Sequence, residues 1–580
     1  MEFSGHAHDR GCSPRPVNGD FSRTWGTYSL VLISALIAAG LCRYYLTLGE
    51  TPFEDAAMLL RYSLNFAEGH GIVWNVGSKP VAGATDFLPM VAVAFLIKAG
   101  LGPMAAVQSL GITCHVLTAL IIFWTLRHLE RAGLLAASLS ALYFLAGPGL
   151  VLISAGFTTP AFAVVTAITW YLALNLILRT GTGAYELAFA LSALGLGLIR
   201  PEGAILAVLM LLSIIFARGR SCFRLIVKFA VVFALFGGGY LLWHWRYFGD
   251  FMPLPFYRKG GWRLYPDSLT ESVLGALGFA GPFVFAYLLG LRKPATMRLT
   301  LVFSIPIAGF VAIWLLISDE MNFMMRYQYP VLPIILMSWY PLVKSVGDEI
   351  QSSRLIGFEG WQRGALLWAF QLVLCLYVLA KARQLDLGGE VAHNSNYDIA
   401  IALSRFDHRN TLAAAEAGIV PFYSGWRTID TWGLNDPWIA KRGLIDRQYL
   451  DSSKPMVIEI EGPFNLASDD YHMGDQNGAW KAMATVLKCY ARENHYILAA
   501  AFGATPYDTM TYYVRPGGES AAIVKMIRSI PVSDVSSGGK VPAIDFISQF
   551  THDSGGGSDP ASPTADQVPD KSVECDATSR

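Results

Sequence analysis

The sequence predicts a mainly α-helical protein that crosses a membrane many times and carries a smaller α/β domain after the last span. Of its 580 residues, 53% are hydrophobic and only 15% are charged, whereas soluble globular proteins carry about 25% charged residues. Apolar runs of about 20 residues recur, and each is long enough to cross the hydrocarbon core as a helix. After residue 380 this pattern gives way to short alternating segments of strand and helix character.

The amino-terminal segment, residues 1–27, is expected to be a cytoplasmic tail. The apolar run that follows is too long for a signal-peptide core and lacks a cleavage site, so it is interpreted as a retained first span. The formal net charge is zero, which gives no general indication of nucleic-acid binding. The seven cysteines are scattered, with no CxxC and no disulfide-like spacing.

The transmembrane domain is expected to cover residues 28–382 and to contain about 11 helices. Basic residues between the spans favour a cytoplasmic amino terminus and an external carboxyl terminus. This orientation requires that the short run 87–100, which carries Lys98, is interfacial or re-entrant, and that the first external loop is 49–104. The predicted spans are 28–48, 105–126, 133–148, 160–178, 184–199, 201–217, 225–244, 273–291, 298–318, 328–343 and 363–381.

The first external loop carries an acidic pair, Glu54 and Asp55, at the edge of the bilayer. Carboxylates are costly to desolvate there, so they are usually functional. The loop after the 225–244 span carries four basic residues on the external side, against the trend. Two alternatives explain these residues: a solvated interfacial loop with aromatic anchors, or an anion site that binds phosphate. The segments around 200–203 and 326 are also external, so all these loops can converge on one cavity.

A soluble α/β domain is expected over residues 383–531, because strand and helix patterns alternate there. No GxGxxG or P-loop motif supports a nucleotide site. The Ser-, Gly- and Pro-rich tail, 532–580, is expected to be flexible or disordered. The predicted strands are Thr411–Ala415, Thr428–Thr431, Met456–Glu461, Tyr496–Ala500 and Thr511–Arg515, and the helices lie near 396–407, 436–443, 478–493 and 519–529.

External acids, external basic loops and a multispan body suit chemistry on a lipid-phosphate substrate. The lipid tail would lie in the bilayer, and Arg and Lys would hold the phosphate as charge develops on it. A carboxylate would deprotonate the acceptor hydroxyl.

Several segments also resemble one known family in collinear order. The first external loop resembles "DDAFISFRYARNLAEGHGLVFN…VEGYTNFLW", and the others resemble "SGLETPLFA", "RPEG", "YFGDPLPNTFYAK", "RY…P" and "AGAIPYYS…DLLGLND". This pattern is typical of bacterial GT-C glycosyltransferases similar to the mycobacterial terminal β-(1→2) arabinofuranosyltransferase. The matching segments are 53–75 with 81–87, 154–160, 200–203, 246–259, 325–330 and 417–436.

The resemblance implies a membrane glycosyltransferase of the bacterial inner membrane, with its active site and soluble domain on the periplasmic side. The enzyme would move a sugar, such as arabinofuranose or another pentose, from a polyprenyl-phosphate donor to a glycan, lipid or protein acceptor of the cell envelope. Asp55 would be the base, with Glu54 beside it. The candidate substrate-binding residues are Arg61, His70, Arg200, Glu202, Arg246, Tyr257, Lys259 and Arg326.

Structural roles compete with these assignments. Asp55 can pair with Arg61, His70 can belong to a tight turn, and Arg200 can form an ion pair with Glu202. No histidine spacing predicts zinc, and no cofactor is predicted, while a divalent cation at the acidic pair stays open.

The sequence departs from the family pattern at three places: Glu54 replaces Asp, Thr158 replaces Glu, and 84–86 replaces Tyr-Thr-Asn. A flippase of lipid-linked sugars, which would show inverted repeats, and a noncatalytic envelope assembly factor are the rival functions.

Overall fold

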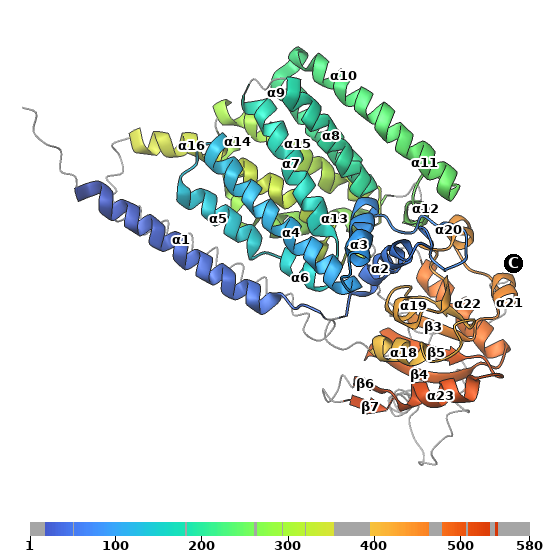
Figure 1. Ribbon diagram of the computed structural model, residues 1–580. Helices are drawn as coiled ribbons and strands as arrows, with labels where there is room; N and C mark the ends of the chain where they lie inside the picture. The colour runs from blue at the N-terminus through green and yellow to red at the C-terminus, as the bar shows by residue number, and fades with distance from the viewer. Residues whose placement is uncertain are drawn as a thin grey trace, which may run out of the picture.

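The computed structural model describes residues 18–49, 51–179, 183–259, 264–292, 294–318, 321–352, 395–462, 478–505, 508–533 and 540–542. A bundle of long helices occupies the amino-terminal part of the chain, and a small α/β domain lies at one end of the bundle (Figure 1). The predicted boundary at 382/383 and the predicted span 363–381 lie outside the described residues, as does most of the tail.

The bundle confirms the prediction of a polytopic helical membrane protein. Within the described ranges, seven helical stretches are long and apolar enough to cross a membrane, and each predicted span from 28–48 to 328–343 falls on a helix. The long helices are α1 (Asn18–Tyr45), α4 (Pro103–Trp124), α5 (Leu134–Leu145), α7 (Thr159–Leu178), α8 (Gly183–Ile199), α9 (Pro201–Arg218), α10 (Phe223–Val232), α11 (Gly238–Phe248), α13 (Pro266–Ala280), α14 (Val284–Leu291), α15 (Pro294–Ala312) and α16 (Leu332–Ser352).

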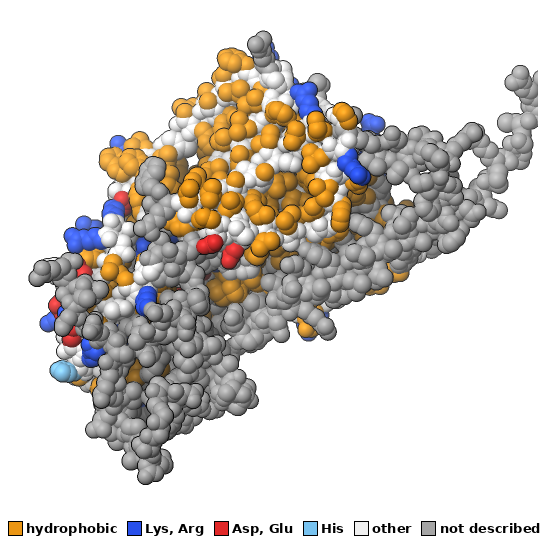
Figure 2. Space-filling model, turned by 180° about the vertical axis from the view of Figure 1, so that it is seen from behind, with side chains coloured by type: hydrophobic (Ala, Val, Ile, Leu, Met, Phe, Trp, Pro, Cys, Tyr) orange, Lys and Arg blue, Asp and Glu red, His pale blue; other side chains and the backbone are white. Residues whose placement is uncertain are grey.

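The outer surface of the bundle is apolar, as a lipid-facing surface requires. Large side chains such as Phe223, Leu235 and Phe285 are 72%, 65% and 67% exposed. Seen from behind, hydrophobic side chains cover the described part of the helical body (Figure 2). The protein is therefore a multi-pass membrane protein.

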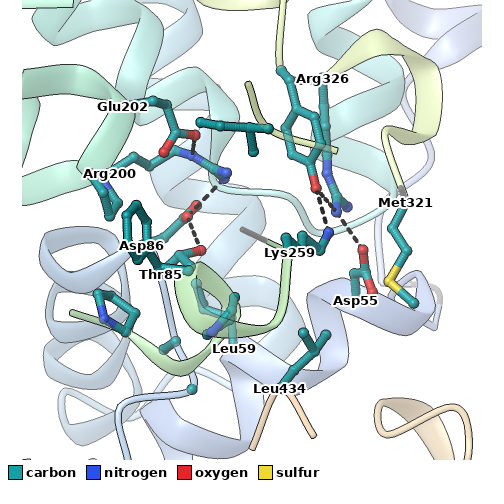
Figure 3. A pocket seen from close by; sticks show the side chains of 18 of the residues that line it. Asp55, Leu59, Thr85, Asp86, Arg200, Glu202, Lys259, Met321, Arg326 and Leu434 are labelled. Carbon is teal, nitrogen blue, oxygen red and sulfur yellow. Dashed lines mark hydrogen bonds and ion pairs between the residues drawn. The ribbon is translucent and has the colours of Figure 1, made fainter. Parts of the chain in front are cut away.

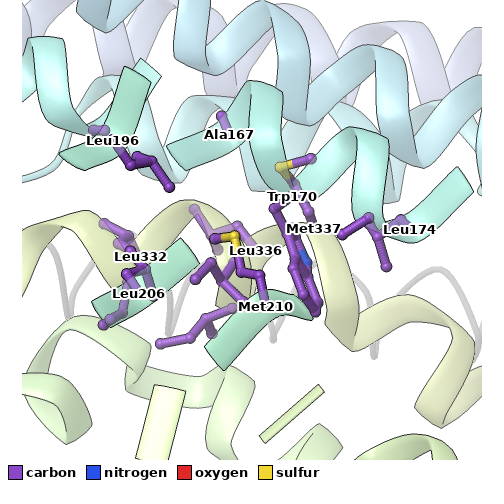
Figure 4. Packing of buried hydrophobic residues seen from close by; sticks show 14 of the residues in the cluster. Ala167, Trp170, Leu174, Leu196, Leu206, Met210, Leu332, Leu336 and Met337 are labelled. Carbon is purple, nitrogen blue, oxygen red and sulfur yellow. The ribbon is translucent and has the colours of Figure 1, made fainter. Parts of the chain in front are cut away.

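Inside the bundle, α7, α8, α9 and α16 pack around one apolar core (Figure 4). Trp170 on α7 is fully buried and donates through its indole nitrogen to the Ser338 hydroxyl on α16 at 2.8 Å. A Cβ at Gly203 would overlap the backbone of Leu196, so α8 and α9 meet very closely. Close backbone approach at small residues is how helices associate in lipid, and it fixes the α8–α9 junction that carries Arg200.

The first external loop folds into two helices, α2 (Glu54–Ala67) and α3 (Phe87–Lys98), which pack against each other. They lie where the bundle meets the soluble domain (Figure 1). At 12 residues, α3 is too short to span the bilayer by itself, because a span needs about 20 residues. Two short helices, α6 (Gly149–Ser154) and α12 (Leu254–Lys259), also end near this junction.

The soluble domain has a five-stranded mixed sheet in the order β2-β1-β3-β5-β4. The first three strands in this order are parallel, and β5 is antiparallel to both β3 and β4. The strands are β1 (Thr411–Ala414), β2 (Arg427–Asp430), β3 (Val457–Gly462), β4 (Ile497–Thr505) and β5 (Asp508–Val514), with a separate hairpin of β6 (Pro531–Ser533) and β7 (Lys540–Pro542).

Successive residues of β3 point to opposite faces of this sheet. Val457 therefore joins one buried cluster and Ile458 the other, and helices cover both faces. The helices are α18 (Ser395–Leu403), α19 (Ile419–Ser424), α20 (Pro437–Arg442), α21 (Arg447–Ser453), α22 (Ala479–Glu493) and α23 (Ser520–Ser529). The α/β prediction is confirmed strand by strand, while the short helices α19 and α21 were not predicted.

Candidate active site

A cavity of about 940 Å³ lies between the helical bundle and the soluble domain. Its walls are largely apolar, with Ile205, Trp314 and Leu316 on the bundle side and Leu434 from the soluble domain. Ligand sites usually combine such apolar walls with a few convergent polar groups. The ionisable groups that line the cavity are Asp55, Asp86, Arg200, Glu202, Tyr257, Lys259, Arg326 and Tyr327.

Asp55 is presented to this cavity by the first turn of α2 (Figure 3). Its side chain is 10% exposed and accepts a hydrogen bond from Nη2 of Arg326 in a buried ion pair. The amino-terminal end of a helix is a favourable place for a carboxylate, and Asp55 lies in the first turn of α2. The competing pairing of Asp55 with Arg61 is not the one observed.

Two cationic side chains gather around Tyr327, next to Asp55. Lys259 on α12 and Arg326 each donate to the hydroxyl of Tyr327 at 3.3 Å. Burial alone would raise the pKa of Tyr327, but Lys259, Arg326 and Arg200 together hold that pKa below its ordinary value. The ring of Trp314 stacks on Tyr327 at 4.6 Å and fixes its orientation.

Arg326 is incompletely satisfied by the protein. It is 8% exposed, yet its Nε and Nη1 atoms are buried without a hydrogen-bond partner. A buried guanidinium nitrogen without a hydrogen-bond partner is costly, and here the guanidinium lies over the rings of Phe157 and Tyr327, 4.3 and 5.1 Å from their centres. The cavity thus places an incompletely paired cation beside a carboxylate.

The segment that carries Arg326 is held in a strained backbone conformation. Met321, Met324 and Met325 all have positive φ angles, of 64°, 52° and 54°. Non-glycine residues rarely adopt this region, and such strain clusters at functional sites. The strained turn is what brings Arg326 and Tyr327 into the cavity wall.

A second polar cluster lines the opposite side of the cavity (Figure 3). Arg200, just before α9, donates to Asp86 at 2.9 Å and to Glu202 at 2.5 Å. Thr158 donates its hydroxyl proton to the other oxygen of Asp86. Positions 86 and 158 both depart from the family pattern, and here their side chains are in direct contact. The Arg200–Glu202 ion pair that the sequence left open is present, and it forms part of the cavity lining.

The remaining candidate residues lie in different places. Tyr257 lines the cavity and is 38% exposed. Arg61 is buried outside the cavity, where it donates hydrogen bonds to backbone carbonyl oxygens. His70 lies 3.6 Å from Glu68 on the surface, and Arg246 is exposed and does not line the cavity.

Glu54 does not point into the cavity. Its Oε1 accepts hydrogen bonds from the backbone N–H groups of Gly418 and Ile419 in the soluble domain. Glu54 and Asp55 therefore have separate partners. Among the residues that the structure describes, no three His, Cys, Asp or Glu side chains are arranged to hold a metal ion.

Asp86, Tyr327 and Trp314 were not selected from the sequence. Asp86 had been noted only as a departure from the family pattern, next to Phe87. Tyr327 follows Arg326 directly in the sequence. An aromatic residue next to a candidate phosphate-binding arginine was the signal that could have identified it. Trp314 lies in an apolar run where nothing distinguishes it from a lipid-facing residue.

Comparison with solved structures identifies the fold. The crystal structure of ArnT from Cupriavidus metallidurans in the apo state matches with a TM-score of 0.55 and 14% identity, over 85% of this chain and 98% of that chain. ArnT from the same organism bound to undecaprenyl phosphate matches with a TM-score of 0.52 and 13% identity, over 83% and 97%. The predicted GT-C fold of membrane glycosyltransferases is thereby confirmed.

Comparison by sequence matches one domain family and no protein of established function. Residues 389–514 match the family model of a domain of unknown function, DUF8728. No curated protein matches the chain.

Proposed function

We propose that this chain is a membrane glycosyltransferase that moves a sugar from a polyprenyl-phosphate donor to an acceptor on the external side of the membrane. The observation that carries this proposal is that Asp55, Arg326 and Lys259 line one cavity at the end of the helical bundle, with Asp55 and Arg326 paired. The neighbour bound to undecaprenyl phosphate supports a lipid-phosphate donor for this fold.

The ion pair between Asp55 and Arg326 suggests how the donor prepares the base. A phosphate that enters the cavity would compete with Asp55 for Nη2 of Arg326, the atom that donates to the carboxylate. Once the guanidinium binds the phosphate, Asp55 is released from the pair and becomes available to the acceptor. Donor binding would thus precede activation of the acceptor.

In the transfer step, Asp55 takes the proton of the acceptor hydroxyl. The acceptor oxygen then bonds to the anomeric carbon, and the bond between that carbon and the phosphate oxygen breaks. Arg326, Lys259 and the Tyr327 hydroxyl stabilise the negative charge that grows on the leaving phosphate. The products are the glycosylated acceptor and polyprenyl phosphate.

The cluster of Arg200, Asp86 and Glu202 lies where the sugar hydroxyls of the donor would be held. A pentose, with arabinofuranose as the candidate from the family resemblance, is the proposed sugar. The proposed acceptor is a glycan, lipid or protein of the bacterial cell envelope, and the proposed location is the inner membrane with the cavity facing the periplasm.

Binding of polyprenyl phosphate to the purified full-length protein tests the donor site. Lys259→Met removes a cavity cation, whereas Lys98→Met removes an exposed lysine at the end of α3 that does not line the cavity. We expect Lys259→Met to weaken binding about tenfold, equivalent to ~1.4 kcal/mol, and Lys98→Met to leave it unchanged. Equal binding by both variants, or equal loss in both, would contradict the assigned donor site.

A further inference from the structure

The soluble domain contacts α2 directly behind the proposed base. Its helix α19 packs against α2, whose first two residues are Glu54 and Asp55. Consecutive residues of a helix point roughly 100° apart. Glu54 therefore faces α19 while Asp55 faces the cavity. The soluble domain thus binds the residue next to the proposed base.

The contact at Glu54 is unusually close. Its Oε1 lies 2.6 Å from the amide nitrogen of Gly418 and 2.7 Å from that of Ile419. Amides at the start of a helix have no partner within the helix, so Glu54 satisfies them from another domain. A Cβ at Gly418 would overlap the backbone carbonyl of Glu54 and would lie 2.6 Å from its Oε1. Only glycine allows α2 and α19 to approach this closely.

Arg61 fastens the next part of α2 to the same domain. Its Nη1 and Nη2 donate to the carbonyl oxygens of Pro421 and Trp426, the latter at 2.9 Å. Its Nε donates to the Trp74 carbonyl at 2.8 Å, and Nη2 also donates to Asn75 at 3.0 Å. All three nitrogens are used by protein atoms, and the side chain is 8% exposed. Arg61 therefore has a docking role and is not disposed to hold a substrate.

In a third contact, a loop of the soluble domain forms part of the cavity wall. Asp430 at the end of β2 accepts hydrogen bonds from backbone amides of the 432–435 loop, at 2.7 to 3.0 Å. This rigid loop places Asn435 to accept the Tyr62 hydroxyl proton at 3.0 Å. The same loop places Leu434 in the wall of the cavity that Asp55 also lines (Figure 3).

We infer that the soluble domain is a positioning element for the base, and that Glu54 is the residue through which it acts. By holding Glu54 against Gly418, the domain sets the rotation of the first turn of α2 and so the direction of Asp55 toward the acceptor hydroxyl. This role differs from direct catalysis by Glu54. It also assigns a function to the segment that matches the domain of unknown function, residues 389–514. The inference rests on the proposed transferase function.

Glu54 and the donor phosphate contact different parts of the chain. Lys259 and Arg326, the cations assigned to the donor phosphate, lie on α12 and on the segment before α16, whereas the hydrogen-bond partners of Glu54 are Gly418 and Ile419. Loss of Glu54 should therefore lower kcat while leaving KM for the donor unchanged. Displacement of a catalytic group by about 1 Å can cost on the order of 10²-fold in rate, which is the loss expected for Glu54→Ala.

The test combines kinetics with hydrogen exchange on the full-length protein. Glu54→Ala removes the acceptor, and Glu54→Gln keeps an oxygen that can accept both amides. Gly418→Ala obstructs the contact from the other side. Gly102→Ala is the control, because a Cβ there meets nothing within 4 Å. Exchange of the 416–424 segment reports docking whether or not the protein has transferase activity.

The expected result is faster exchange in Glu54→Ala and Gly418→Ala, with kcat lowered and donor KM unchanged, and recovery of most of kcat in Glu54→Gln. Faster exchange with a normal kcat would overturn the positioning role and leave the transferase function intact. Unchanged exchange in Glu54→Ala would overturn the docking role of Glu54. If the wild type docks normally but transfers no sugar, the proposed function itself fails.

Discussion

The buried ion pair of Asp55 and Arg326 allows the proposed catalytic role of Asp55 to be separated from its contribution to stability. The two side chains are 10% and 8% exposed. Breaking one side of such a pair leaves a buried, uncompensated charge and costs about 3–5 kcal/mol. Asp55→Asn keeps an oxygen acceptor for the guanidinium, so we expect the lower end of this range, about 3 kcal/mol of lost stability.

Removing both charges should restore most of this stability, because replacing a whole buried pair by neutral groups is often close to neutral. The double variant Asp55→Asn with Arg326→Met should therefore be more stable than Asp55→Asn alone. Transfer should stay low in both, because loss of a general base costs 10²–10⁴-fold in rate as a rough range. Stability would recover without activity.

The assay compares thermal unfolding and sugar transfer for the wild type, both single variants and the double variant in the same detergent. A coupling energy within about 0.5 kcal/mol of zero would refute the inferred energetic pairing of the two residues. An undiminished transfer rate in Asp55→Asn would refute its role as the base.

Three further predictions follow from other contacts of the site. Burial raises the pKa of Glu54 from 4.5 to about 8, so docking of α19 should weaken as pH rises through this window, because the undocked form releases a proton that the docked form retains. Hydrogen exchange of the 416–424 segment as a function of pH measures this, and Glu54→Gln should reduce the slope. The neighbouring buried carboxyls Glu416 and Glu459, whose pKa values burial also raises, should account for the remaining slope. Arg200→Lys should lose one of two charge-assisted hydrogen bonds, about 1.5–3 kcal/mol, and lower the apparent unfolding temperature; an unchanged temperature would contradict the bridging role. Gly83→Ala would place a Cβ against Asn435 and the Tyr62 hydroxyl and should destabilise the contact between the first external loop and the soluble domain by about 1–3 kcal/mol. The expected readout is faster proteolysis of the variant than of the wild type. An unchanged proteolysis rate would show that this contact tolerates the extra volume.

The fold was largely predictable because its signals are local. Apolar runs that must satisfy their backbone within lipid can only form helices, and alternation of side chains identifies strands such as β3. The helices α19 and α21 are six and seven residues long and were missed, because such short segments give only a weak periodic signal. The equally short helix α20 was nevertheless predicted.

The site was predictable only in part. Asp55, Lys259 and Arg326 lie far apart in sequence, and the family resemblance together with the external loops placed them in one site. The contact between Asp86 and Thr158, and the strained backbone before Arg326, depend on tertiary packing that no local pattern encodes. Glu54 was predicted as a catalytic acid beside Asp55 and Arg61 as a substrate-binding residue. Glu54 instead binds backbone amides 364 and 365 residues later in the chain. Arg61 binds carbonyl oxygens 360 and 365 residues later, as well as Trp74 and Asn75 nearby.

Single-turnover sugar transfer by the purified protein in proteoliposomes tests the central claim most directly. Radiolabelled polyprenyl-phosphate pentose and hexose donors would be supplied with a cell-envelope acceptor extract, alongside an established transferase as a positive control. The account predicts label transfer by the wild type and its loss in Asp55→Asn, while Asp55→Asn still inserts and still binds polyprenyl phosphate. Transfer by Asp55→Asn at the wild-type rate, or no transfer by the wild type where the positive control is active, would contradict it.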